Sequence, residues 1–143
     1  GDVFGLSTPP FNESLGLSGA DDTYFFRQAF LAGKKIIYAD DAVVIEHIPA
    51  SRARTSWLLR REYRRGNTLS VSLVGLEDSR RRRLKRTGHA AAATFHGIAL
   101  LLAAPLRGRS TLVHGLQRLC FAAGLLTGLT GRPYAEYRHI HGR

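Results

Sequence analysis

In the first third of the chain, an irregular segment is followed by apolar residues at helical spacing and then by runs typical of strands. Apolar positions four residues apart, such as Phe25 and Ala29, predict a helix over residues 24–32. The acidic pair at its start places the first turn near Asp21, and Gly33 is well placed to end the helix. The sequence therefore predicts one amphipathic helix that follows an irregular segment.

Two short β-like runs come after this helix. Residues 35–38 predict one strand, and the β-branched run at 42–47 predicts a second. Strand side chains alternate between two faces, so Val43, Ile45 and His47 would share one face. A helix followed by paired strands indicates an α/β unit in residues 1–50.

The remainder of the chain is predicted to be helical. Residues 55–65 read as a helix that ends at Gly66, with Trp57, Arg61 and Arg64 on one side at offsets of four and three.

Two apolar segments, 90–106 and 112–129, follow and are separated by a basic break at 107–109. The first is slightly shorter than a bilayer-crossing helix, and the second is diluted by polar residues. Both are expected to lie in the membrane interface or to dip into it, with a helical hairpin packed on the protein as the alternative.

Composition limits the class of protein. The 143 residues are 44% hydrophobic, which suits one modest domain. The chain opens with Gly-Asp-Val-Phe and contains no Met, so its first residue is interpreted as a cut within a longer protein. One cysteine, Cys120, excludes an internal disulfide and a cysteine-based zinc site within the chain.

Charge is distributed unevenly along the chain. Residues 1–49 carry three basic and seven acidic side chains, whereas residues 50–88 carry twelve basic and three acidic ones. The net charge is +10. A basic region attracts the phosphates of nucleic acids, nucleotides or lipid head groups, and charge alone does not choose among them.

One stretch carries a family resemblance. Residues 11–47 contain Phe-Asn-Glu, a Gly-rich loop, Asp21-Asp22, an aromatic helix, Ala-Gly, a strand, and Ala-Val-Val ending in His47. This order resembles family 2 glycosyltransferases of the GT-A fold. The expected fold class is therefore α/β: the C-terminal part of a GT-A (Rossmann-like) glycosyltransferase domain, followed by a basic, apolar helical tail.

The resemblance assigns chemistry to the acidic pair. Asp22 matches the proposed catalytic base, which takes the proton of the acceptor hydroxyl, and Asp21 stands where the family has Glu. A carboxylate at a helix N-terminus is held ionised by the helix dipole. The alternative role for either residue is to cap the helix.

The same resemblance places a metal ligand at His47. It matches a His that completes a Mn²⁺ or Mg²⁺ site on the donor diphosphate, where the metal stabilises the leaving nucleotide. The other ligands would come from an Asp-x-Asp motif in a missing N-terminal half. The alternative is a strand-end His that hydrogen-bonds a loop.

The basic helix supplies the remaining candidate residues. Arg60, Arg61 and Arg64 are expected to reach the donor diphosphate or an anionic acceptor lipid through forked pairing with phosphate oxygens, or else to form a solvated or membrane-facing basic surface. Trp57 is expected in the core or stacked on the acceptor. Residues 80–83 are expected to anchor at lipid head groups.

These features predict a glycosyltransferase that moves a sugar from a nucleotide-sugar donor to a glycan or lipid-linked acceptor, and the family resemblance implies that it inverts the anomeric carbon. We expect it on the cytoplasmic face of the cell membrane, peripheral or monotopic, against an anionic membrane surface and without a specific nucleic acid partner. The isolated chain is expected to be inactive. The alternative is a basic membrane-associated or nucleic-acid-binding module without catalysis.

The chain is expected to divide into four parts. Residues 1–70 would form the C-terminal half of the catalytic domain, and residues 71–88 a basic linker. Residues 89–131 would form two apolar, membrane-associated helices, and residues 132–143 a polar tail.

Overall fold

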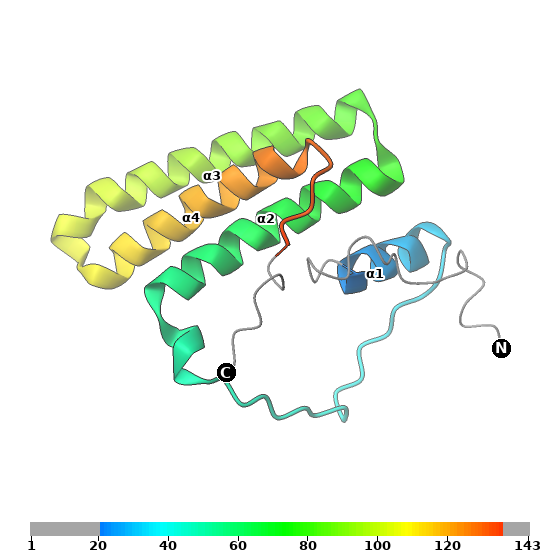
Figure 1. Ribbon diagram of the computed structural model, residues 1–143, viewed down its shortest axis with the longest axis horizontal. Helices are drawn as coiled ribbons and strands as arrows, with labels where there is room; N and C mark the ends of the chain where they lie inside the picture. Colours follow the sequence, from blue (N-terminus) through cyan, green and yellow to red (C-terminus); the bar gives the residue numbers. More distant parts are fainter. Residues whose placement is uncertain (1–20, 136–143) are drawn as a thin grey trace.

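The computed structural model describes residues 21–135, apart from the side chains of Asp21 and Ser51, and this part of the chain is helical (Figure 1). Three long helices make up most of it, and a short helix and a 3-10 turn precede them. The elements in chain order are α1 (Asp21–Leu31), η2 (Ala50–Ala53), α2 (Thr55–Glu77), α3 (Arg80–Arg107) and α4 (Arg109–Gly128).

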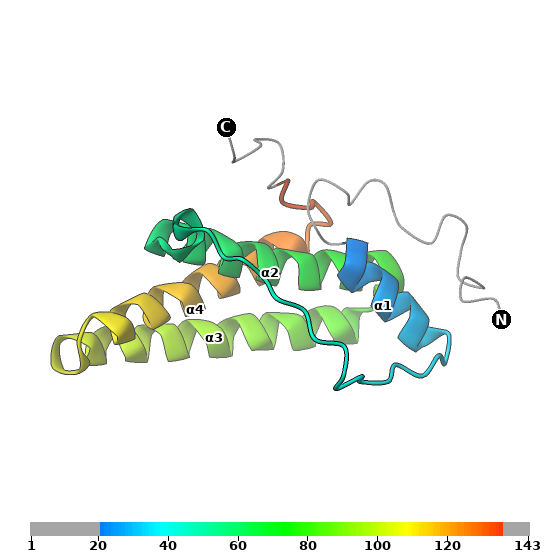
Figure 2. The ribbon, with the colours of Figure 1, turned by 90° about the horizontal axis from the view of Figure 1, so that it is seen from below.

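The long helices form a three-helix bundle with α4 in the middle. α4 packs along both α2 and α3, whereas α2 and α3 touch each other little. α3 runs antiparallel to the other two helices, and Figure 2 shows it on the side of the bundle away from η2. α1 packs against α2.

Small residues form the contact between α2 and α4. A Cβ atom added to Gly66 would collide with the backbone of Phe121, and one added to Gly124 would collide with the backbone of Tyr63. A Cβ atom added to Gly128 would collide with the backbone of Asn67 and lie 2.7 Å from the Cβ atom of Ser70. The two backbones therefore approach as closely as helices can, which is how helix pairs pack where there is no hydrophobic drive between them.

The contact between α3 and α4 follows the same rule. A Cβ atom on Gly97 would lie 3.0 Å from the carbonyl oxygen of Gly115, and one on Gly115 would lie 3.0 Å from that of Gly97. Alanines fill the next turns of α3, where Ala90 and Ala93 are buried. Among the described residues, most of the buried apolar side chains are alanines. The full set is Ala29, Val71, Leu73, Ala90, Ala93, Ala104, Ala122 and Leu125.

Large apolar side chains lie on the outside of the bundle instead. Phe95, Leu102 and Leu106 of α3 are 74%, 77% and 92% exposed, and Ile98 is exposed beside them. These four residues fall on one stripe of α3, opposite the stripe that packs on α4. We call them the outer face of α3. A water-soluble helix normally places its large apolar residues in the core, so this arrangement is reversed.

Turn residues set the ends of the helices. Gly108 has φ 89° between α3 and α4, and Gly33 has φ 71° after α1, a backbone region that favours glycine. Ser79 caps α3 by accepting a 3.3 Å hydrogen bond from the Arg82 amide. The predicted helix in residues 24–32, its stop at Gly33 and the break at 107–109 are confirmed.

The predicted α/β fold class is wrong for the described part of the chain. Residues 35–38 and 42–47 are extended but pair with no strand within residues 21–135, and their side chains are exposed. A β-run becomes a strand only when a neighbour completes its hydrogen bonds. Residues 1–20, which hold the first part of the family-like motif, lie outside the described residues.

The predicted stop at Gly66 is also wrong. α2 continues through Gly66 to Glu77, and α3 begins at Arg80 within the dense basic run. Gly66 is in the helix interior because the backbone of α4 leaves no room for a side chain there. The helices thus pass through the predicted divisions at residues 70 and 88.

Candidate functional site

The predicted base, Asp22, lies in the first turn of α1 with its side chain exposed. Its Oδ1 accepts hydrogen bonds from the Thr23 amide at 2.5 Å and the Thr23 hydroxyl at 3.3 Å. A capping side chain would bind the amide two or three residues ahead instead. Within residues 21–135, Oδ2 of Asp22 accepts no hydrogen bond, so it can receive a proton. The side chain of Asp21 lies outside the described part.

A charged network holds α1 against the bundle. Arg27 of α1 forms an ion pair with Glu77 at the end of α2, and Arg82 of α3 lies 2.5 Å from the same carboxylate. Burial, with the nearby charge of Arg27, lowers the pKa of Arg86 on α3. Tyr24 of α1 packs on the buried side chain of Val71. These contacts fix the direction of α1 and hence the position of Asp22.

His47 lies in the exposed extended segment between α1 and η2. No interaction joins it to Asp22 within residues 21–135. Over the same residues, no cluster of three or more His, Cys, Asp or Glu side chains could hold a metal ion. The described residues alone therefore do not fit a Mn²⁺ or Mg²⁺ site.

Trp57 and Arg61 are brought together, as their spacing predicted. The Arg61 guanidinium carbon lies 5.5 Å from the Trp57 ring centroid, and that of Arg52 lies 5.9 Å from it. Arg60 is exposed on the same helix, and Arg64 is half-buried. Two arginines, Arg52 and Arg61, therefore lie against the half-buried ring of Trp57 near the start of α2. The helical spacing did not indicate Arg52, which lies before α2.

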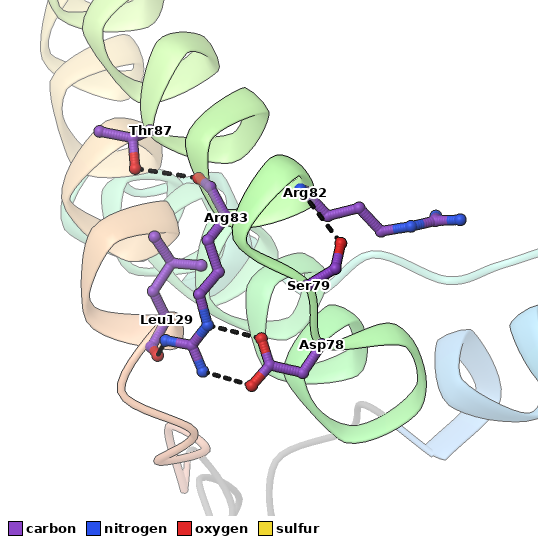
Figure 3. Close-up of polar contacts among 6 residues, drawn as sticks. All are labelled: Asp78, Ser79, Arg82, Arg83, Thr87 and Leu129. Carbon is purple, nitrogen blue, oxygen red and sulfur yellow. Dashed lines mark hydrogen bonds and ion pairs between the residues drawn. The ribbon is translucent and has the colours of Figure 1, made fainter.

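The basic run at the start of α3 also has a structural role. Arg83 donates from Nε and Nη2 to the two carboxylate oxygens of Asp78 at 2.5 and 2.7 Å, and from Nη1 to the Leu129 carbonyl at 3.1 Å (Figure 3). This forked pair lowers the pKa of Asp78 and raises that of Arg83. Arg83 thus joins the ends of all three long helices.

A cavity that the sequence did not predict lies along α4, and residues of α2 and α3 complete its wall. It is open to solvent, its volume is about 360 Å³, and six of its seven lining residues have polar side chains. The only signal in the sequence was the presence of polar residues within the apolar run 112–129. The lining residues are Glu62, Arg65, His96, Leu100, His114, Gln117 and Arg118.

Comparison with known proteins shows a relative of this chain among proteins of polysaccharide biosynthesis. The chain is 32% identical over 126 residues to the succinoglycan biosynthesis protein ExoM of Rhizobium meliloti (strain 1021). The aligned region covers 88% of this chain and 40% of that protein. No family model and no solved structure matches the chain.

Proposed function

We propose that this chain forms the membrane-facing part of a glycosyltransferase of polysaccharide biosynthesis. The substrates would be a nucleotide-sugar donor and a lipid-linked glycan acceptor. The observation that carries the proposal is the similarity to a succinoglycan biosynthesis protein over nearly the whole of this chain. The matched region is less than half of that relative, so the activity proposed is that of a whole protein of this kind.

The position of Asp22 supports sugar transfer as the reaction. In the proposed step the acceptor oxygen attacks the anomeric carbon, and the bond from that carbon to the nucleotide diphosphate breaks. The diphosphate leaves with the electron pair, and the hydroxyl proton passes to Oδ2 of Asp22. A positioned carboxylate is the usual means of activating so weak a nucleophile. The family 2 assignment and inversion at the anomeric carbon are part of this proposal.

The bundle supports a membrane-bound acceptor. α3 is long and apolar enough to cross a membrane, whereas no other helix within residues 21–135 passes the same test. Its exposed apolar outer face and the small-residue contacts with α4 are typical of helices in lipid. The basic run at 80–86 stands at one end of α3, where lipid phosphates would meet it. We therefore propose that the outer face of α3 rests in the cytoplasmic face of the cell membrane.

Three further assignments remain predictions. His47 would contribute one ligand to a divalent metal, with the others from beyond the described residues. Arg60, Arg61 and Arg64 would bind the donor diphosphate or the acceptor, and Trp57 would stack on a sugar. The cation–π contacts support a preformed group around Trp57, since two arginines already lie against its ring.

The test is sugar transfer by the whole protein in membrane vesicles, with a radiolabelled nucleotide sugar and a lipid-linked acceptor fraction. The side-chain oxygen of Asn can accept the same hydrogen bonds from Thr23 but Asn takes up no proton, so Asp22→Asn should reduce kcat by at least about a hundredfold. The matched control is Asp41→Asn in the exposed turn after the first β-like run, which should retain full turnover. Equal activity of Asp22→Asn and the control would refute the catalytic role, and no transfer by the wild type with any donor would refute the enzyme proposal.

A further inference from the structure

The cavity between the long helices differs in character from the surface around it. Two of its lining residues come from α2, two from α3 and three from α4. On α3, His96 lies directly beside the exposed Phe95, at the edge of the outer face. A polar pocket set next to an apolar face indicates a ligand that has a polar and an apolar part.

The wall of the cavity is rich in hydrogen-bond donors. Arg65 and Arg118 carry fixed positive charge, the imidazoles of His96 and His114 each carry an N–H donor, and Gln117 adds an amide. Glu62 is the single carboxylate in this wall. With both imidazoles neutral, the lining charge is +1, so the cavity favours an anion.

Most of these donors have no partner in the described protein, and three of the residues, His96, His114 and Arg118, are exposed to solvent. Within residues 21–135, the side chains of His96, His114, Gln117 and Arg118 make no hydrogen bond or ion pair with the protein. Arg65 is oriented, because its guanidinium carbon lies 4.7 Å from the Phe121 ring centroid. Its ion pair with Glu62 is long, at 3.5 Å. One oriented guanidinium and several open donors therefore surround the same space.

The chemistry of the donors narrows the ligand class. The carboxylate and two imidazoles of this wall form no metal-binding cluster. Guanidinium groups pair in a forked manner with tetrahedral oxyanions, and phosphate is the one that the substrates of the proposed reaction contain.

We propose that this cavity binds a phosphate or diphosphate group, with Arg65 and Arg118 as its main ligands. The imidazoles of His96 and His114 donate to the remaining oxygens. If the group belongs to the acceptor lipid, its apolar chain lies along the outer face of α3, beside Phe95. The choice of phosphate among oxyanions and its assignment to the acceptor rest on the proposed function, whereas the anion-binding character of the wall does not.

The first test is calorimetric titration of the whole protein with inorganic pyrophosphate, without a sugar donor. Arg118→Gln should weaken binding about tenfold or more, the loss expected for one charge-assisted contact. The matched control is Arg109→Gln, which removes the same charge from the first residue of α4, outside the cavity lining, and should change affinity less than about twofold. Equal weakening by the two variants would overturn the site, since it would mean a diffuse charge effect.

A second variant protects the test against a folding artefact. Glu62→Gln removes the one carboxylate from the wall and should tighten pyrophosphate binding, a gain that a damaged fold does not produce. Unchanged or weaker binding by Glu62→Gln would overturn the proposal.

Vesicles identify the source of the phosphate. Phosphatidylcholine vesicles that contain a prenyl phosphate should bind wild type more tightly than Arg118→Gln if the group is a lipid head group. Binding of free pyrophosphate with no such vesicle preference assigns the site to a soluble phosphate. Absence of Arg118-dependent binding in both assays would overturn the site.

The proposed transferase function and the proposed phosphate site can be refuted independently of each other. Asp22→Asn should lose transfer and keep pyrophosphate binding, whereas Arg118→Gln should raise the KM for a lipid acceptor with little change in kcat. A cavity that binds phosphate in a protein without transferase activity would leave the phosphate site standing and refute the proposed function alone.

Discussion

Replacing Gly124 with alanine tests the close packing of α2 and α4. The added Cβ would collide with the Tyr63 carbonyl oxygen and lie 2.9 Å from the Asn67 amide nitrogen. Both atoms belong to the backbone of α2, so no side-chain rotation relieves the overlap and the helices must separate. Overpacking of this kind costs about 1–3 kcal/mol of unfolding free energy.

Helix propensity acts in the opposite direction. Alanine is favoured over glycine in a helix interior by about 1 kcal/mol, so the net effect of Gly124→Ala should be a loss of up to about 2 kcal/mol. For a chain of this size a loss of about 2 kcal/mol corresponds to a fall in Tm of about 4–8 °C. Gly88 of α3 supplies the matched control, because a Cβ atom there would meet nothing within 4 Å.

The assay is thermal unfolding followed by far-ultraviolet circular dichroism. Gly88→Ala should raise Tm by about 2–4 °C through propensity alone, while Gly124→Ala lowers it. If Gly124→Ala raised Tm as much as Gly88→Ala, the two helices would not be in backbone contact, and the small-residue account of the core would be refuted.

Three other predictions follow from single side chains. Asn67→Ala should cost about 1–3 kcal/mol, because Asn67 is 3% exposed and binds the backbone segment after α4 with both ends of its amide; a loss below about 0.5 kcal/mol in denaturant unfolding would contradict this. The folded-state pKa of Asp78 is lowered, so its pairing with Arg83 stabilises the fold above the ordinary carboxyl pKa of about 4, and this stabilisation is lost as the pH falls through the lowered pKa. The Tm of Asp78→Asn should therefore be lower than that of the wild type at neutral pH and equal to it in strong acid. A difference in Tm that persisted in strong acid would refute the stabilising role of the pairing. Burial, with the nearby charge of Glu62, raises the pKa of the Cys120 thiol, so a thiol reagent should label native protein at pH 7 more slowly than urea-unfolded protein, and equal rates would contradict the burial.

The helices could be predicted from local patterns, but the sheet could not. The four-residue spacing in α1, the left-handed glycines at 33 and 108 and the apolar runs all act within a few residues, so the sequence alone indicates them. The β-like run at 42–47 depends on neighbours that local propensity does not supply, and it is extended and unpaired in the described chain.

Packing explains why the sequence predicts an end of α2 at Gly66 that the structure does not have. Glycine ends a helix when no tertiary contact opposes it, but here the glycine admits the backbone of α4. The cavity was missed for a related reason, because its arginines and histidines come from three helices and meet only in the folded bundle. Trp57 and Arg61 could be paired from sequence because they lie one turn apart on a single helix.

The most direct test of the membrane-facing account is the depth of the outer face of α3 in lipid. A spin label at Leu102→Cys, in the whole protein with Cys120→Ala, would be compared in anionic vesicles with a label at Arg81→Cys. The account predicts that the label at position 102 collides with dissolved oxygen more than with a water-soluble nickel complex, and that the label at 81 shows the reverse. If the label at 102 collided with the nickel complex as readily as the label at 81, the outer face of α3 would lie in water. If it collided with neither reagent, the outer face would be covered by protein. Either result would contradict the proposal that this face rests in the membrane.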